Sequence, residues 1–66
     1  MDNILIYDNN GDLVGRYTEM ELKNFIIPNS GDKIVFKDIS QCVVREKTVK
    51  EILFDFEAKV IEIYLE

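Results

Sequence analysis

Carboxylates are the only side chains in this sequence that could supply catalysis. The 66-residue chain has no histidine and one cysteine, and it contains neither a Gly-x-Ser-x-Gly motif nor a glycine-rich phosphate loop. Asp8, Asp12 and Asp32 could meet in the fold, which leaves them as the only candidate catalytic groups. We therefore predict a non-catalytic protein with no catalytic, cofactor-binding or metal-binding residues and no small-molecule substrate.

The segment from Asp8 to Asp12 looks superficially like the start of a calcium loop. An EF-hand loop needs a glycine at its sixth position and a glutamate at its twelfth. Counted from Asp8, the glycine is fourth (Gly11), the sixth residue is Leu13, and Glu19 is twelfth. The Asp and Asn residues of this segment are therefore expected to shape a turn.

Cys42 lies beside Val43 and Val44, without a histidine to activate it. We expect a small, buried hydrophobic side chain rather than a nucleophile. One thiol cannot form an internal disulfide, so a cytoplasmic protein is expected. The N-terminus lacks the basic region of a signal peptide, and no stretch approaches the roughly twenty apolar residues that span a bilayer, so no membrane contact is predicted.

The charge balance disfavours direct binding to nucleic acid. Thirteen acidic and eight basic residues give a net charge of −5, which repels a phosphate backbone. The one locally basic stretch is Arg45 to Lys50, with three bases and one acid. We interpret it as a solvated strand face rather than an anion site.

Seven aromatic residues are available for a core or for a binding surface. Stacking of single-stranded nucleic acid is the less favoured role, because such surfaces normally accompany a basic groove. A fold this small needs most of its large side chains inside, yet both faces of the first predicted hairpin carry apolar residues. We therefore expect an apolar patch rimmed by acids, which indicates a protein partner or self-association. The partner-binding residues themselves remain unknown at this stage.

The first hairpin is the strongest local signal. Residues 3–7 and 13–17 are rich in β-branched and aromatic side chains, and Asn10-Gly11 between them predicts a type I′ turn. That turn pairs Tyr7 with Val14, Leu5 with Arg16 and Ile4 with Tyr17, and it places Gly15 opposite Ile6 with room for a bulge. The predicted core side of the hairpin then comprises Ile4, Ile6, Leu13 and Tyr17.

Two further signals redirect the chain after this hairpin. Thr18-Glu19-Met20-Glu21 is a capping box, so a short helical turn is expected from Glu19 to about Phe25. The turn-forming segment from Pro28 to Asp32 follows. Strands are predicted at 33–37 and from Cys42 to about Lys47, joined by a turn at 38–41.

The last third of the chain fits two structures. Apolar residues recur at helical spacing, so a C-terminal helix over 49–64 is one alternative and would make the fold α+β. The density of Ile, Val, Phe and Tyr instead favours two strands joined by a turn near Glu57-Ala58-Lys59. The second strand would place Ile61, Ile63 and Leu65 on one face.

Residues 28–66 resemble a family of small, uncharacterised bacterial and phage proteins. The likeness rests on Pro28-Asn29-Ser30-Gly31-Asp32-Lys33-Ile34, which fits P-x-x-G-D-x-[IV], on Val44 with Arg45 nearby, and on the terminal segment 60–66, which is loosely similar to the family's final V-x-I-x-L strand. The resemblance implies an SH3-like barrel and carries over no functional residues. We therefore predict one mainly β domain over 1–66, a five- to six-stranded, partly open SH3-like barrel with one short helical turn.

Two functions fit these features. The first is a small protein-binding module of phage or mobile-element type, which uses an aromatic and acidic surface to bind a larger protein or itself. The alternative is an acidic inhibitor that mimics nucleic-acid charge against a DNA- or RNA-binding protein. A mimic needs a dense acidic stripe, whereas eight basic residues dilute the acids of this chain.

Overall fold

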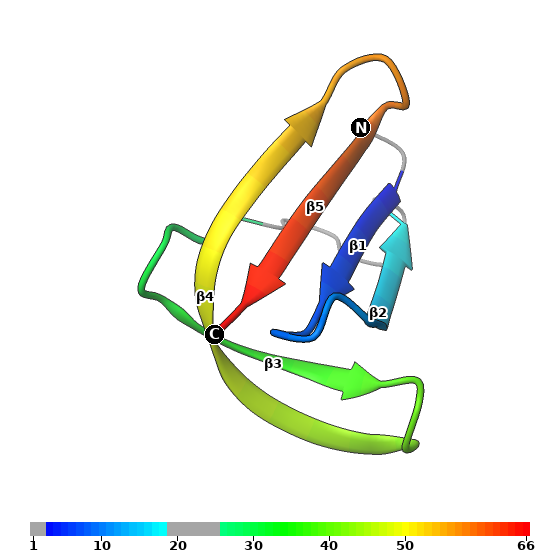
Figure 1. Cartoon of the computed structure of the whole chain (residues 1–66), viewed down its shortest axis with the longest axis vertical. Helices are drawn as coiled ribbons and strands as arrows, with labels where there is room; N and C mark the ends of the chain where they lie inside the picture. Colours follow the sequence, from blue (N-terminus) through cyan, green and yellow to red (C-terminus); the bar gives the residue numbers. More distant parts are fainter. Residues whose placement is uncertain (1–2, 19–25) are drawn as a thin grey trace.

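Five strands account for the regular structure in the described part of the chain. The computed structural model describes residues 3–18 and 26–66, so the helical turn predicted at 19–25 lies outside the described residues. The strands are β1 (Asn3–Tyr7), β2 (Leu13–Thr18), β3 (Lys33–Asp38), β4 (Val43–Asp55) and β5 (Val60–Leu65). They form one sheet in the order β2-β1-β5-β4-β3 (Figure 1).

The sheet is built from a hairpin and a three-stranded meander. β1 and β2 pair antiparallel, as do β3 with β4 and β4 with β5. The two units meet where β1 pairs in parallel with β5, from Asn3 beside Val60 to Tyr7 beside Tyr64. The first and last strands of the chain therefore lie side by side at the centre of the sheet (Figure 1).

The sheet curls into a half-barrel. Its two edge strands approach each other at one end, where Ile39 N donates to Val14 O at 2.8 Å and Lys37 N donates to the Tyr17 hydroxyl at 2.9 Å. These two bonds link β2 to the β3 region without a continuous ladder between the strands. The mainly β, partly open barrel predicted from the sequence is confirmed at this level.

The core fills the concave side of the curled sheet. Every strand contributes to it, and its buried hydrophobic residues are Ile4, Ile6, Val14, Phe36, Val49, Ile61, Ile63 and Leu65. The predicted alternation of β5 is confirmed, because its three buried residues occupy every second position. Side chains of a strand point to opposite faces in turn, so the intervening residues of β5 face away from the core.

The turn of the first hairpin differs from the predicted type I′ turn. Gly11 has a φ of 86°, but Asn10 is not among the residues with positive φ. Gly11 N donates to Asp8 O at 3.0 Å, and the Asp8 carboxylate accepts from the N–H groups of Asn10 and Asp12 at 2.9 and 3.0 Å. The Asp8 side chain thus stabilises a longer loop with a single left-handed glycine, a common alternative in hairpins.

The predicted hairpin register holds only at the open end of the hairpin. It shifts after Ile6, so Tyr7 pairs with Leu13 and not with Val14. The bulge gives Val14 the core position and leaves Leu13 exposed, which reverses their predicted places. Gly15 remains opposite Ile6, where a Cβ atom would lie 3.0 Å from the Ile6 Cδ1 atom. The space left by the missing side chain of Gly15 is therefore occupied by the Ile6 side chain.

The predicted turn before β3 is confirmed and is attached to β4. Asp32 N donates to Asn29 O at 3.0 Å, and Gly31, the third residue of this turn, has a φ of 95°. Gly31 N donates to Val49 O, and Val49 N donates to Asp32 O, both at 2.8 Å. The Ser30 hydroxyl donates to Lys50 O at 2.6 Å. The turn therefore continues the β3–β4 ladder by two bonds.

The C-terminal third forms strands, so the alternative helix over 49–64 is wrong. The predicted turn near residues 57–59 is confirmed at 56–59, but the strand predicted from Cys42 to about Lys47 and the first C-terminal strand form one unbroken strand of 13 residues, β4. A bulge at Lys50 shifts the pairing with β5, because Val49 faces Leu65 while Glu51 faces Tyr64. Pairing between β4 and β5 lets alternate residues pack against the core on one side of the sheet. β-branched side chains pack better on such a half-buried sheet surface than in a helix.

Cys42 is exposed, which corrects the prediction of a buried side chain. It ends the turn between β3 and β4, where Cys42 N donates to Asp38 O at 2.7 Å and its φ is 56°. Because of this left-handed conformation, Cys42 is not part of the strand that its valine neighbours form. β4 accordingly begins at Val43, one residue later than predicted.

Most of the aromatic side chains within residues 3–18 and 26–66 lie outside the core, contrary to the prediction. Phe36 is buried and Tyr17 packs against the core cluster, whereas Phe56 is 80% exposed. Tyr7 and Tyr64 are half-buried on the convex side of the sheet. Isoleucines of β1 and β5 take the central positions, because their strands lie in the middle of the sheet.

Glycine at either of two left-handed positions is expected to stabilise the fold. Cys42 and Lys59 have φ values of 56° and 57°, a conformation that costs an L-residue about 1–2 kcal/mol. Glycine avoids this cost but loses about 0.5–1 kcal/mol more backbone entropy on folding. Cys42→Gly and Lys59→Gly should each raise the free energy of unfolding in urea by about 0.5–1 kcal/mol.

The matched control for Lys59→Gly is Glu57→Gly in the same turn. Glu57 has no positive φ, so glycine there only adds entropy to the unfolded chain and should destabilise the protein. Equal effects of the two glycines would contradict the assigned strain.

Candidate functional site

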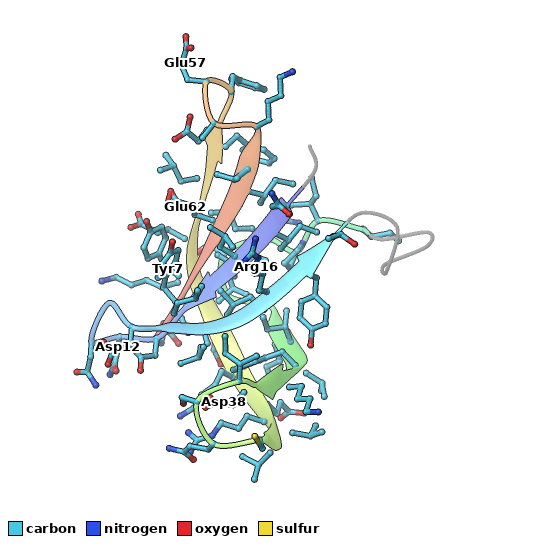
Figure 2. The ribbon with its side chains drawn as sticks, turned by 90° about the vertical axis from the view of Figure 1, so that its right-hand side faces the viewer. Tyr7, Asp12, Arg16, Asp38, Glu57 and Glu62 are labelled. Carbon is cyan, nitrogen blue, oxygen red and sulfur yellow. The ribbon has the colours of Figure 1, made fainter. Side chains whose placement is uncertain are left out.

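The convex side of the sheet carries a mixed apolar and acidic surface over four strands. Directly paired residues point to the same side of a sheet, so the register defines two rows across β2, β1, β5 and β4. These rows are Leu13, Tyr7, Tyr64 and Glu51, and then Arg16, Leu5, Glu62 and Leu53. We call these eight residues the tyrosine face. Figure 2 shows its Tyr7 and Glu62 on the same side of the sheet.

Two stacked tyrosines form the centre of the first row. The rings of Tyr7 and Tyr64 lie 5.3 Å apart between centroids, with 16° between their planes. The parallel pairing of β1 and β5 sets them directly beside each other. Stacked rings present a rigid apolar surface that loses little conformational entropy when a partner covers it.

Glu62 connects the stacked tyrosines to the second row. The Tyr64 hydroxyl donates to Glu62 Oε1 at 3.2 Å. Partial burial raises the pKa of Tyr64, and the hydrogen bond to Glu62 together with the nearby charge of Glu51 raises it further. The phenol therefore stays protonated at neutral pH and keeps the Glu62 carboxylate in place as an acceptor.

The second row surrounds this carboxylate with aliphatic side chains. Glu62 is paired with Leu5 on one side and with Leu53, which is 50% exposed, on the other. Arg16 lies beyond Leu5 as the one base among the eight residues. A carboxylate between apolar side chains suits a partner that brings a cation and apolar groups together.

The sequence contained a partial signal for this surface. Leu5 and Tyr7 occupy the positions of β1 that alternate with the buried isoleucines, so the strand is apolar on both sides. The predicted patch of apolar residues beside acids is present here. Its membership could not be derived from the sequence, because the pairing of β1 with β5 joins residues almost sixty positions apart.

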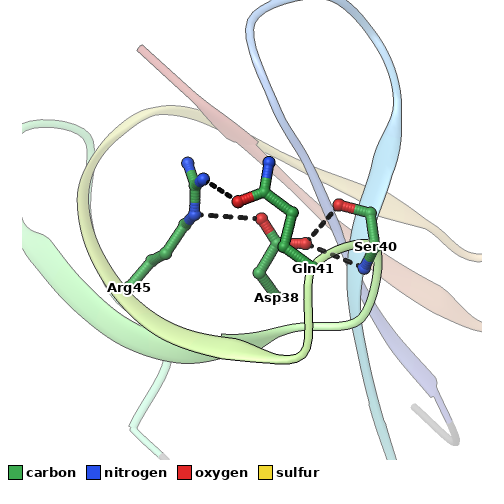
Figure 3. Close-up of polar contacts among 4 residues, drawn as sticks. All are labelled: Asp38, Ser40, Gln41 and Arg45. Atoms are coloured by element: carbon green, nitrogen blue, oxygen red, sulfur yellow. Dashed lines mark hydrogen bonds and ion pairs between the residues drawn. The ribbon is translucent and has the colours of Figure 1, made fainter.

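A second polar cluster lies in the turn between β3 and β4 (Figure 3). Asp38 is buried, and its carboxylate accepts from the N–H group of Ser40 at 2.9 Å and from the Ser40 hydroxyl. Arg45 Nε lies 3.2 Å from Asp38 Oδ2, and the Arg45 guanidinium also donates to the Gln41 side chain. These contacts satisfy the buried carboxylate and fix the turn, which is a structural role.

The pH dependence of stability tests this role. The Ser40 hydroxyl lowers the pKa of Asp38, burial opposes it, and the Ser40 N–H and the Arg45 charge reinforce the lowering. A carboxylate with a lowered pKa in the folded state stabilises the fold above its ordinary pKa, and this contribution is lost as the pH falls through the folded value. Asp38→Asn should therefore be less stable than wild type in urea at pH 7, and the difference should shrink as the pH falls below the ordinary pKa of an aspartate. A constant difference across this range would contradict the assignment.

The basic stretch from Arg45 to Lys50 divides between the two sides of β4. Arg45 is paired with Asp38, and Val49 is fully buried, whereas Glu46 and Lys47 are exposed. The predicted solvated face therefore holds for only part of the stretch. A polar hollow of about 250 Å³ lies beside Arg45 and is also lined by acids, among them Asp8 and Glu66. Arg45 is already paired with Asp38, and Lys47, the other base that lines the hollow, faces acids there, so the hollow does not present a cluster of cations to an anion.

Two of the three aspartates singled out in the sequence, Asp8 and Asp32, stabilise turns through their carboxylates, and Asp12 contributes only backbone groups to the first turn. Asp8 accepts backbone N–H groups in the first hairpin turn, and Asp32 Oδ2 accepts from Asn29 N at 2.8 Å in the turn before β3. The expectation that the Asp8–Asp12 segment shapes a turn is confirmed. Within residues 3–18 and 26–66, no group of three histidine, cysteine, aspartate or glutamate residues has an arrangement that could hold a metal ion.

The half-barrel with its tyrosine face defines a small curled-sheet domain. Comparison of the chain with protein-family models, curated proteins and solved structures finds no match. In the part of the chain that the structure describes, no helix has the length and apolar character needed to cross a membrane.

Proposed function

We propose that this chain is a non-catalytic protein-binding module that binds its partner through the tyrosine face. The observation that carries the proposal is the stacked pair Tyr7 and Tyr64 beside Glu62, set among exposed leucines on a sheet face that no described element covers. Tyrosine is enriched at the centres of protein interfaces, where it supplies a large apolar area with one polar end.

The chemistry of the face specifies the partner. Glu62 and Glu51 can each accept hydrogen bonds from a lysine or arginine, and the tyrosine rings can pack against the stem of that side chain. The net charge of −5 adds long-range attraction for a basic surface. The proposed partner is a protein that presents basic side chains among apolar ones.

We also propose that the half-barrel is of the SH3-like type. The P-x-x-G-D-x-[IV] segment at residues 28–34 and the terminal strand at residues 60–65, which loosely resembles V-x-I-x-L, support an SH3-like barrel of phage or mobile-element type. The parallel pairing of β1 with β5 departs from an all-antiparallel barrel. The single exposed thiol of Cys42 suits a reducing compartment, so we place the protein in the cytoplasm.

Mimicry of nucleic acid is the alternative function. It requires closely spaced acids that reproduce a phosphate backbone. The tyrosine face carries two acids, Glu51 and Glu62; Tyr64 and Leu53 occupy the positions directly paired with them and interrupt any continuous acidic row, and Arg16 adds a positive charge. This interruption supports partner binding over mimicry.

Binding by immobilised variants tests the proposal. Wild-type chain and Glu62→Lys are immobilised and exposed to an extract of the source cells, and retained proteins are quantified by mass spectrometry. We expect a partner retained by wild type to be lost by at least about tenfold on Glu62→Lys, because the reversed charge repels the partner's cation. A partner whose retention survives competitor DNA supports the proposal, and one displaced by DNA supports mimicry.

Glu57→Lys provides the matched control. Glu57 is exposed in the turn between β4 and β5, away from the two rows of the tyrosine face, and the substitution changes the charge by the same amount (Figure 2). It should retain the partner as wild type does. Equal retention by all three proteins would overturn the assignment of the tyrosine face.

A further inference from the structure

A second exposed surface lies on the ribbon formed by β3 and the first half of β4. Val35 and Val44 are 67% and 71% exposed there, more than any apolar residue of the central strands β1 and β5. Lys37 and Glu46 are also exposed on the same ribbon. We call these four residues the hairpin face. It is separate from the tyrosine face, which uses the second half of β4.

The register arranges the hairpin face as a two-by-two checkerboard. Val35 pairs with Glu46, and Lys37 pairs with Val44, so each row joins one valine to one charged residue. Directly paired residues share a side of the sheet, and diagonal neighbours remain within reach of each other. The two valines therefore occupy one diagonal, and the lysine and glutamate occupy the other.

A checkerboard of this kind is complementary to itself. If a second copy is placed face to face about a two-fold axis along the valine diagonal, each valine meets the same valine of the other copy. The rotation exchanges the other diagonal, so Lys37 of each copy meets Glu46 of the other. A two-fold interface uses the same patch on both subunits, and this patch then makes two apolar contacts and two opposite-charge contacts.

The charged residues are available for these contacts. Within the described residues, neither the Lys37 ammonium nor the Glu46 carboxylate has an ion-pair partner in its own chain. From the valine exposure and the charge complementarity, we propose that the hairpin face binds a second copy of this chain as a weak, two-fold dimer. The face is far smaller than a standard stable interface, so association is expected near millimolar concentration, on the order of 1 mM.

Charge reversal gives a test that a non-specific surface would fail. Sedimentation equilibrium and concentration-dependent NMR shifts are measured for wild type, Lys37→Glu and Glu46→Lys. Each single variant should associate at least about tenfold more weakly than wild type, because like charges then meet twice across the axis. An equimolar mixture of the two variants should associate again, because the charged diagonal then carries two carboxylates in one chain and two ammonium groups in the other.

Two further variants distinguish failure of the dimer from failure of the proposed protein-binding function. The double variant K37E/E46K should associate as wild type does, and Glu62→Lys, which alters the tyrosine face, should leave association unchanged. Dispersed NMR spectra establish that each variant is folded. The dimer is overturned if wild type stays monomeric at about 1 mM, if the mixture does not associate, or if Glu62→Lys alone abolishes association.

Discussion

Replacing Ile63 with alanine is expected to unfold most of the chain at 25 °C. Ile63 is buried in the central strand β5, opposite Ile6 on one side and Ile52 on the other. Truncation of a buried isoleucine to alanine costs about 2–5 kcal/mol, from lost transfer free energy and the cavity left behind. A core of this size rarely supplies more than about 3–5 kcal/mol of stability, so little of the folded state should remain.

The matched control is Leu53→Ala on the other side of the same sheet. Leu53 is 50% exposed on the tyrosine face and makes no contribution to the core cluster. It should change the free energy of unfolding by less than about 1 kcal/mol, while it weakens capture of the partner by the tyrosine face. Urea denaturation followed by circular dichroism measures both variants. A folded, stable Ile63→Ala protein would contradict the assigned core.

The second large effect is expected at Gly31, where valine should destabilise the protein by about 2 kcal/mol. Gly31 has a φ of 95°, and nothing lies within 4 Å of the position that a Cβ atom would take. The cost is therefore backbone strain and not a steric clash with neighbouring groups. A β-branched residue is the least tolerant of this conformation. A relaxed turn would also lose the bond from Gly31 N to Val49 O.

Gly31→Asn separates strain from loss of the glycine itself. Asparagine tolerates positive φ better than other residues, so this variant should lie between wild type and Gly31→Val in thermal unfolding. Ser30→Ala is a further comparison, because it removes only the hydroxyl bond to Lys50 O and should cost about 1 kcal/mol. Equal destabilisation by valine and asparagine at Gly31 would contradict the strain argument.

The small core links stability to the proposed binding. A ligand that binds only the folded state raises stability in proportion to the logarithm of its concentration over Kd. Because the described part of the chain has a small core, with eight buried hydrophobic residues, a partner on the tyrosine face would add substantially to the stability of the domain. Thermal unfolding should therefore shift upward when the partner is added, and this shift should be absent for Glu62→Lys.

The choice between a helix and two strands in the C-terminal third illustrates what pattern alone leaves open. The residues from Val49 to Leu65 satisfy helical spacing and also alternate in the second half. β-branched and aromatic composition favoured strands, and the structure confirms them. The deciding factor is tertiary, because the core residues of β5 are covered by Ile4 and Ile6 of β1.

The exposed position of Cys42 and the hairpin register were beyond the reach of the sequence for a different reason. A bulge or a left-handed residue changes which side of the sheet the neighbouring side chains face. Asp8 accepts two backbone N–H groups and favours a longer loop over the two-residue turn. Such local competition between side chain and backbone is not visible in the alternation of apolar residues.

The sequence by itself determined the strand at Lys33–Asp38, the turns at Asn29–Asp32 and near residues 57–59, and the absence of histidine. These features depend on composition and short-range turn chemistry. Only the tertiary structure decided that Tyr7 stacks on Tyr64 and that Glu62 lies between Leu5 and Leu53. The physical reason is that parallel pairing of the first and last strands joins residues without any local signal in the chain.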